Sequence, residues 1–340
     1  MELKERIFNC LNPIGISARE QGIAKYLREE LFALGIDAKI DESGNVHGRI
    51  LCEKEDAKTL LLEAHMDQIG LMVSGIDEDG YVKFTALGGV DERILCGAEV
   101  EIQSKIPVYG IIGAFRNTSD DKNPKIDELR IDIGFDHKTA EEKVKIGDVI
   151  TFKNKPQMLL GNKISAVALD NRAGVAAILH CLERAKNKPL PYHVEVLFSV
   201  GEELGLQGAY KGMDDIDADA AIAVDVTFGQ TPDTKEETGV FPLGCGAVIC
   251  RGPNLHYAYT KQLLSLAKKQ GIPYEIEVAA ASTGTTAWAI QTAGFGVPTM
   301  LVSIPLRYMH TNVETVALSD VQAVSDLLME VVMGGVALAE

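Results

Sequence analysis

Residues 194–203 constrain the fold of this chain more than any other stretch of its 340 residues. Residues 194–200 read Val-Glu-Val-Leu-Phe-Ser-Val, and such a run of β-branched and apolar residues is typical of a strand buried on both faces. The run ends at Gly201, and two adjacent carboxylates follow, Glu202 and Glu203. Because neighbouring side chains of an extended segment point to opposite sides, we expect one glutamate to hold a metal ion and the other to face a bound water. A Glu-Glu pair alone is more often solvated charge at a strand end, so this interpretation depends on the rest of the chain.

Apolar runs alternate with amphipathic segments in the first 67 residues and again from residue 161 onward. The expected strands are residues 59–64, 194–200, 220–224 and 298–304, and the expected helices are residues 17–34, 171–186, 254–270 and 319–334. Ser17 and Glu20 have the spacing of a capping box, and residues 244–253 read as a glycine-rich turn segment. Alternating strands and helices predict an α/β fold with a mainly parallel mixed sheet covered by helices on both faces.

Residues 68–160 follow a different pattern. Short apolar runs alternate there with turn signals such as Asp79-Gly80 and Gly88-Gly89, and no long helix is expected. Regular short strands with glycine-rich turns are typical of a small β-barrel or sandwich. We therefore expect two domains: a catalytic domain made of residues 1–67 and 161–340, and a β domain of residues 68–160 inserted into it.

The charge balance limits the partners of this protein. The formal net charge is -16, and because phosphate binding needs clustered Lys and Arg, nucleic acid is not expected as a partner. No apolar segment is long enough to span a bilayer, and the first residues lack the apolar stretch of a signal peptide. The six cysteines contain no CxxC pair. We therefore expect a cytoplasmic protein with reduced thiols and no membrane partner.

Ligand-type side chains stand at the ends of several other predicted elements. In open α/β sheets, sites form outside the carboxyl ends of the strands. The residues that fall at this rim, beside Glu202 and Glu203, are His65, Asp67, Asp170, Asp225 and His310. Each has an ordinary structural alternative on its own, such as a helix cap for Asp170, but together they predict a single site.

Mixed histidine and carboxylate ligands suit zinc, cobalt or manganese. Two histidines, two aspartates and one glutamate would fit two metal ions, and two-metal hydrolases hold their ions roughly 3.5–4 Å apart around a water of lowered pKa. The remaining glutamate would then act as the general base. Asp67 is placed to hydrogen-bond the other ring nitrogen of a metal-bound His65. The chain has neither the Gly-x-Ser-x-Gly elbow of serine hydrolases nor a Walker loop.

Five short motifs carry these residues. They are His-Met-Asp-Gln-Ile-Gly from His65, Ala-Leu-Asp-Asn-Arg-Ala-Gly from Ala168, Glu-Glu-Leu-Gly-Leu-Gln-Gly-Ala from Glu202, Ala-Val-Asp from Ala223 and Arg-Tyr-Met-His from Arg307. Together they resemble the motifs of the tetrahedral (TET-type) aminopeptidases, also called the glutamyl-aminopeptidase or cellulase-like metallopeptidase family. The resemblance runs the full length of the chain, and it implies a zinc-peptidase-like fold and a dinuclear metallo-aminopeptidase acting on short peptides.

The resemblance also implies a role for each site residue. Asp170 would bridge two metal ions, zinc or cobalt, in each subunit. His65 and Asp225 would complete the protein ligands of one ion, and Glu203 and His310 those of the other. Glu202 would be the general base, and Asp67 would orient His65. The inserted domain would mediate dimerisation, with dimers assembling into hollow dodecamers.

Three positions depart from the pattern of the family. Gly201 stands where many relatives have Gln, Gln68 replaces a frequent Glu, and Thr286 stands where relatives often have Asp. The implied ligands and base are all present, so we expect these departures to affect specificity rather than activity. No substrate-binding residue is assigned. Two alternatives stay open: a related N-acyl amidohydrolase or deacylase, and a catalytically silent peptide-binding subunit of an assembly.

Overall fold

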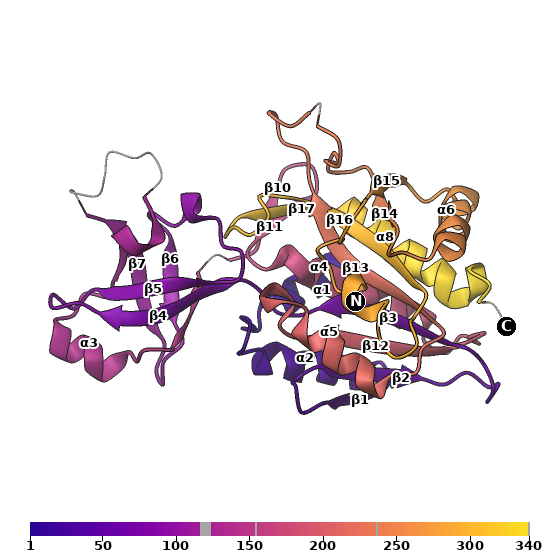
Figure 1. The fold of residues 1–340 in the computed structure, drawn as a ribbon, viewed down its shortest axis with the longest axis horizontal. Helices are drawn as coiled ribbons and strands as arrows, with labels where there is room; N and C mark the ends of the chain where they lie inside the picture. The colour runs from indigo at the N-terminus through magenta and orange to yellow at the C-terminus, as the bar shows by residue number, and fades with distance from the viewer. Residues whose placement is uncertain (116–123, 154, 236, 339–340) are drawn as a thin grey trace.

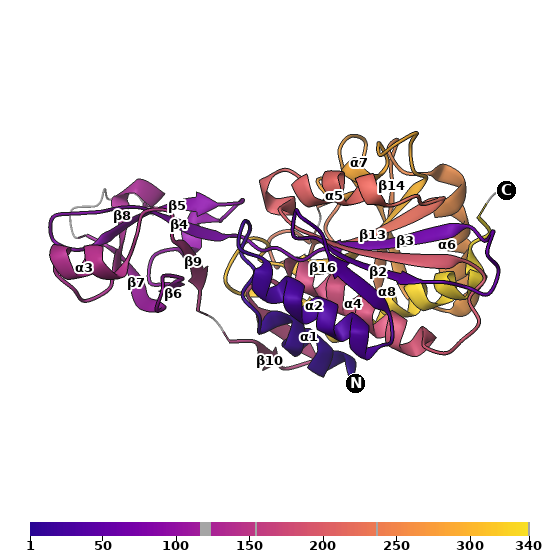
Figure 2. The same cartoon turned by 90° about the horizontal axis from the view of Figure 1, so that it is seen from below.

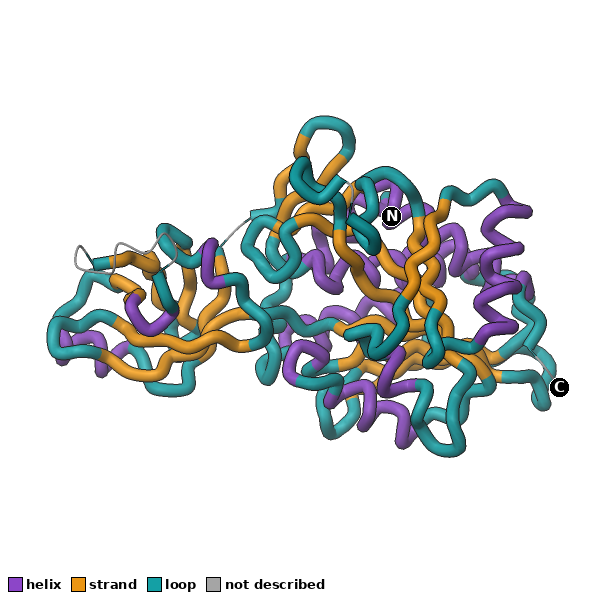
Figure 3. Tube along the Cα trace, turned by 45° about the horizontal axis from the view of Figure 1, so that its top comes forward, coloured by secondary structure: helices purple, strands orange, loops and turns teal. Residues whose placement is uncertain are grey.

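The structure is a computed structural model, and it describes residues 1–115, 124–153, 155–235 and 237–338. The molecule is elongated, with a small β-barrel at one end and a larger α/β part at the other (Figure 1). Figure 3 shows the strands of the barrel (orange) set apart from the strands of the larger part, around which most of the helices (purple) are gathered.

Eleven strands of the described residues form one mixed sheet, in the order β1-β2-β12-β3-β13-β16-β17-β11-β10, with β14 paired to β16 and β15 paired to β14. Their bounds are β1 Asp37–Ile40, β2 Val46–Ile50, β3 Thr59–His65, β10 Gln157–Leu159, β11 Lys163–Ala166, β12 His193–Ser199, β13 Ala220–Phe228, β14 Ala247–Arg251, β15 Tyr274–Val278, β16 Thr299–Arg307 and β17 Glu314–Ala317. The central strands β12, β3, β13 and β16 run parallel. The predicted fold class is therefore confirmed, although residues 244–253 contain strand β14 and are not simply a turn segment.

Helices cover both faces of this sheet (Figure 2). One face packs against the larger helices, which are α1 Leu3–Leu11, α2 Gln21–Ala33, α4 Leu169–Ala185, α6 Tyr257–Gln270 and α8 Leu318–Glu330. The other face packs against the short helices α5 Gln207–Gly212 and α7 Ala287–Ile290. Helix α8 continues into the π-helical turn η5, Val331–Gly335.

Side chains alternate between the two faces along each strand, and this alternation positions the candidate site. On β3, Leu60 and Leu62 belong to the core against the larger helices, whereas Leu61 belongs to the core on the α5–α7 face. The same alternation places Glu63 and His65 on the α5–α7 face, nearer the carboxyl end of the strand. Along β3, the side chains on the α5–α7 face therefore change from apolar to polar toward the carboxyl end of the strand.

The barrel is closed by six strands in the order β4-β5-β8-β7-β6-β9. Their bounds are β4 Gly70–Ile76, β5 Val82–Leu87, β6 Glu99–Ile102, β7 Val108–Ala114, β8 Leu129–Asp132 and β9 Val149–Phe152, and the helix α3 His137–Lys143 lies against them. The barrel has a hydrophobic cluster of its own, in which Leu71, Val100 and Ile131 are fully buried. Within the part of the chain that the structure describes, no helix has the length and apolar character needed to cross a membrane.

Candidate active site

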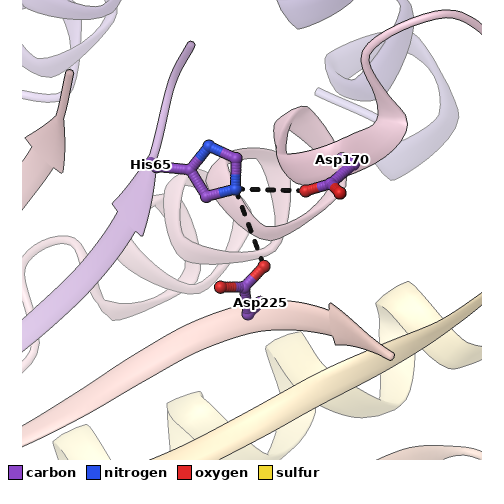
Figure 4. Close-up of side chains that lie close together, drawn as sticks. All are labelled: His65, Asp170 and Asp225. Carbon is purple, nitrogen blue, oxygen red and sulfur yellow. Dashed lines mark hydrogen bonds and ion pairs between the residues drawn. The ribbon is translucent and has the colours of Figure 1, made fainter. Parts of the chain in front are cut away.

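Three elements bring His65, Asp170 and Asp225 together in the interior (Figure 4). His65 is the last residue of β3, Asp225 lies on the neighbouring strand β13, and Asp170 lies at the start of α4. The Nε2 atom of His65 lies 3.1 Å from Oδ1 of Asp170 and 3.6 Å from Oδ1 of Asp225. One imidazole nitrogen therefore faces two carboxylates, and all three side chains are buried.

A second group of side chains shares Asp170. The Nε2 atom of His310, in the loop after β16, lies 3.6 Å from Oδ2 of Asp170 and 3.5 Å from Oε2 of Glu203. In each of the two groups, the candidate ligand atoms all lie within 4.8 Å of one another. The two oxygens of Asp170 thus face different histidines, Oδ1 toward His65 and Oδ2 toward His310.

The backbone of the two adjacent glutamates is not extended, so the expected alternation of their side chains is wrong. Strand β12 ends at Ser199, Gly201 takes the left-handed conformation with φ 60, and Glu202–Leu204 forms the 3-10 turn η3. Successive side chains of a 3-10 helix are about 120° apart, and this rotation separates the two carboxylates. Glu203 joins the ligand group of His310, whereas Glu202 lines the cavity outside both groups.

Asp67 fixes the position of this turn. Its Oδ1 atom accepts a hydrogen bond from the backbone N–H of Glu202 at 3.0 Å, and its Oδ2 atom accepts one from the N–H of Glu203 at 3.3 Å. The hydroxyl of Ser17 donates to the same carboxylate at 2.7 Å. Oδ1 also lies 3.4 Å from Nδ1 of His65, too far for a well-formed hydrogen bond but close enough for electrostatic attraction.

Ser17 does not form the predicted capping box. Helix α2 begins at Gln21 after Glu20, and no side chain caps its first turn. The Ser17 hydroxyl is directed instead to Asp67, far away in the sequence. A contact between distant segments has therefore replaced the local one that the spacing of Ser17 and Glu20 predicted.

Burial of so much negative charge shifts the titration of the site. Burial raises the pKa of Glu202 to about 8, and the charges of Asp225 and Asp170 add to this effect while that of His65 opposes it. The pKa of Glu203 is raised well above its ordinary value, first by burial and then by Asp170. The pKa of Asp170 is lowered, because its contacts with His310 and His65 outweigh its burial.

The donor set fits divalent metal ions. The carboxylates of this small region outnumber its imidazoles; they are Asp67, Asp170, Glu202, Glu203 and Asp225, against His65 and His310. Such an excess of buried negative charge is unfavourable unless cations compensate it. Mixed nitrogen and oxygen ligands are those that zinc and related ions take, and two groups joined through one carboxylate match a pair of ions.

Two further charged residues support the site, although the sequence does not indicate them. The carboxylate of Glu314 on β17, which is 1% exposed, accepts hydrogen bonds from the backbone N–H of Asp170 at 3.1 Å and of His310 at 3.0 Å. The fully buried Arg172 donates to the backbone carbonyl of Met66 at 2.6 Å and to that of Cys10 at 2.8 Å. Glu314 and Arg172 thus hold the backbone segments that carry the candidate ligands in place.

Glu63 is a third such residue. It is fully buried on β3, accepts a hydrogen bond from the Ser199 hydroxyl at 2.6 Å, and accepts another from the Thr286 hydroxyl. Burial raises its pKa to about 7. Its signal in the sequence is a lone charge inside the apolar run of β3, since glutamate is almost never fully buried without a partner.

A cavity of about 630 Å³ opens beside the two groups. His65, Asp170, Glu202, Glu203, Asp225 and His310 form one part of its wall, so the structure gathers these predicted residues at one cavity, with Asp67 behind them. The rest of the wall comes from β13, β14, β15, β16 and the loop at residues 282–285, together with Gly89, Leu206, Ala279 and Met309. The volume lies within the range of small-molecule and peptide-end sites.

Comparison with known proteins gives a consistent result along the chain. Residues 44–327 match the model of the M42 glutamyl aminopeptidase family. A putative aminopeptidase of Acetivibrio thermocellus is 34% identical over 94% of this chain and 95% of its own length. A lysyl aminopeptidase of Pyrococcus furiosus is 32% identical over 90% of each chain.

Solved structures agree with this similarity. An aminopeptidase from the archaeon Desulfurococcus kamchatkensis superposes with a TM-score of 0.91 at 30% identity, covering 97% of this chain and 94% of the other. The TET1 peptidase of Pyrococcus horikoshii, which can assemble into a tetrahedron or a large octahedral shell, superposes with a TM-score of 0.86 at 30% identity. That superposition covers 98% of this chain and 100% of the other.

Proposed function

We propose, from the premise that this chain belongs to the M42 glutamyl aminopeptidase family, that its two ligand groups hold a pair of divalent metal ions. The protein is a metal-dependent aminopeptidase, a hydrolase of peptide bonds. The observation that carries the two-ion proposal is the placement of Asp170, whose two carboxylate oxygens face different histidines at 3.1 Å and 3.6 Å.

Each ligand then has a defined place. Asp170 would bridge the two ions, His65 and Asp225 would hold one of them, and Glu203 and His310 would hold the other. We propose zinc or cobalt as the metal, because histidine nitrogen combined with carboxylate oxygen is the donor set these ions share. When bound, such ions lower the pKa of a water and polarise the substrate carbonyl.

Glu202 acts as the general base in this proposal. Its carboxylate lines the cavity but belongs to neither ligand group, so it is free to exchange protons. It accepts a proton from the attacking water and delivers it to the nitrogen of the leaving peptide, so the proton balance is closed within one turnover. Asp67 acts as a positioning residue, because it holds the backbone of Glu202 and Glu203 and faces His65.

The organisation of the chain supports a further part of the proposal. We assign catalysis to residues 1–67 and 161–340, and dimerisation to the inserted domain of residues 68–160. The closed barrel with its own hydrophobic cluster lies in that insert. The tetrahedral and octahedral assembly stated for the TET1 peptidase supports self-association here, and we propose that it proceeds through dimers to dodecamers. The cytoplasmic location stays a prediction.

The activity is tested with paired substrates. Metal-stripped protein is reloaded with zinc or cobalt and assayed on aminoacyl-p-nitroanilides and on their N-acetylated counterparts. We expect cleavage of only the unblocked set, dependent on added metal. Cleavage of only the blocked set would support the deacylase alternative, and silence on both sets with metal bound would support the peptide-binding subunit.

A further inference from the structure

The cavity contains an acidic side chain that the catalytic roles above do not use. We propose that Glu277 selects substrates whose N-terminal residue has a cationic side chain, lysine or arginine. This proposal rests on the aminopeptidase function described above and specifies the side chain that the enzyme prefers.

The position of Glu277 follows from how β15 is attached to the sheet. Strand β14 joins β16 through only two register pairs, Val248 with Ser303 and Ile249 with Val302, and β15 pairs with β14. The short junction leaves β14 and β15 outside the main row of strands of the sheet. Glu277 thereby reaches β13, where its Oε1 atom accepts a hydrogen bond from the hydroxyl of Thr227 at 2.9 Å.

The position of Thr227 shows how far Glu277 lies from the ligand groups. It follows Asp225 by two residues on the same strand, so both side chains lie on the same face of the sheet. Two residues of extended strand span roughly 7 Å, about the reach of an extended lysine side chain. A substrate whose terminal amide lies at the ligand groups can therefore extend a long side chain along Thr227 to the carboxylate of Glu277.

The charge of the cavity wall favours a cation at this place. No lysine or arginine is among the described residues that line the cavity, and the histidines in its wall are His65 and His310. None of the ion pairs found among the described residues involves Glu277, so its hydrogen bond with Thr227 leaves its charge uncompensated. Burial raises the pKa of Glu277, and the charge of Asp225 raises it further. The hydrogen bond from Thr227 lowers this pKa, but by less. A substrate ammonium or guanidinium group would supply the missing positive charge, whereas a substrate glutamate would be repelled.

The neighbouring walls suit a long side chain with a polar end. Cys250 is the register partner of Glu277 on β14, and both line the cavity. Ala279 adds an apolar surface to the cavity wall, and Thr283 and Thr285, joined through their hydroxyls at 2.9 Å, add a polar one. The methylene groups of lysine would pack along this passage while its charged end meets Glu277.

The test compares lysyl and norleucyl p-nitroanilides, which differ by the charged amino group, in the metal-loaded protein. We expect kcat/KM for the lysyl substrate to exceed that for the norleucyl substrate by about tenfold or more, because a hydrogen bond to a charged group is among the stronger ones. In Glu277→Gln, kcat/KM for lysyl and arginyl substrates should fall about 10- to 100-fold, while that for the norleucyl substrate stays within about threefold.

Glu275→Gln is the matched control. Glu275 lies on the same strand, carries the same charge and is exposed outside the cavity, so this variant should keep the lysyl preference. An equal loss on lysyl and norleucyl substrates in Glu277→Gln would overturn the proposal, because it would mean that Glu277 serves the common α-amino group or the fold. A preference of the wild-type protein for glutamyl substrates would overturn it as well.

A binding measurement separates this proposal from the proposed activity. Lysinamide and norleucinamide are titrated calorimetrically into wild-type protein and Glu277→Gln. If the wild-type protein binds lysinamide more tightly than norleucinamide and Glu277→Gln does not, the proposed role of Glu277 is supported. If no peptide is cleaved in that case, only the proposed aminopeptidase activity is refuted. Equal binding of the two amides by the wild-type protein, together with cleavage of norleucyl substrates, would refute the pocket and leave the activity standing.

Discussion

At the scale of single residues, Asp67 shows how one buried carboxylate serves two parts of a site. It faces Nδ1 of His65 and also holds the backbone N–H groups of both Glu202 and Glu203. The proposed general base and one proposed metal ligand therefore depend on the same side chain. A residue two positions after a histidine would ordinarily be considered only for its effect on that histidine.

Replacement of Asp67 by asparagine tests this double role. The amide keeps the volume but turns one acceptor into a donor, which opposes the backbone N–H groups of the turn. We expect kcat to fall about 10- to 100-fold, the range typical of residues that support metal ligands. Ser17→Ala, which removes one hydrogen bond to Asp67, should cause a smaller loss. Unchanged kcat in Asp67→Asn, with circular dichroism showing the native fold, would contradict the role.

Sequence patterns identify some of these residues and not others, for a physical reason. His65, Asp170, Asp225 and His310 can be predicted because each stands where an apolar run ends or a helix begins. Glu63 stands inside an apolar strand and Glu314 begins a short one, and only their charge marks them. Their partners are distant: Thr286 is 223 residues from Glu63, and Asp170 is 144 residues from Glu314. No local pattern contains those contacts.

At the scale of elements, the loop between the barrel strands β5 and β6 contributes to the site, because Gly89 lies in the cavity wall. Gly89 follows β5 and lies against the imidazole of His310, and the N–H of Asp91 donates to the carbonyl of His310 at 3.1 Å. A Cβ atom on Gly89 would lie 2.7 Å from Nδ1 of His310. The imidazole can be in its present place only because residue 89 has no side chain.

Gly89→Ala is therefore expected to displace His310 and to weaken one of the two metal positions. Metal analysis after dialysis should give about one tightly held ion per subunit where the wild-type protein holds two, in line with a lost ligand contact. Gly113→Ala is the control, because a Cβ atom there meets nothing within 4 Å. Retention of both ions in Gly89→Ala would show that His310 tolerates the crowding or is not a ligand.

Element boundaries show where the sequence analysis fails. The parallel strands are predicted well, because continuous apolar runs are typical of strands buried on both faces. The turn at Glu202 was expected to be extended, but the left-handed Gly201 rotates the chain into a 3-10 turn. The glycines at 244 and 246 predict a turn segment, whereas the residues that follow them, Ala247–Arg251, form strand β14.

At the scale of the whole molecule, the barrel presents apolar side chains to solvent. Ile106 and Ile146 are 71% and 74% exposed. The loops that carry them are joined by the hydrogen bond from Ser104 to Asp148 at 2.6 Å. Exposed isoleucines on two loops that are joined in this way are typical of a surface that another subunit covers.

The double variant Ile106→Lys with Ile146→Lys tests the assignment of self-association to the inserted domain. We expect the mass of the particle to fall, since paired lysines on each subunit would repel one another and would oppose burial of that surface. Mass photometry measures the change. Phe32→Lys, at an exposed apolar residue on α2, is the control and should leave the mass unaltered. An assembly of wild-type size in the double variant would show that the interface between subunits does not include this surface.

The central claim is that Asp170 joins two metal ions while Glu202 binds neither, and metal stoichiometry tests it most directly. Asp170→Asn and Glu202→Gln are dialysed against zinc and then against metal-free buffer, and the retained zinc per subunit is measured by mass spectrometry. We predict that Glu202→Gln keeps two ions and loses turnover, whereas Asp170→Asn loses tightly held metal. Two tightly held ions in Asp170→Asn, or full activity in Glu202→Gln, would contradict this account of the site.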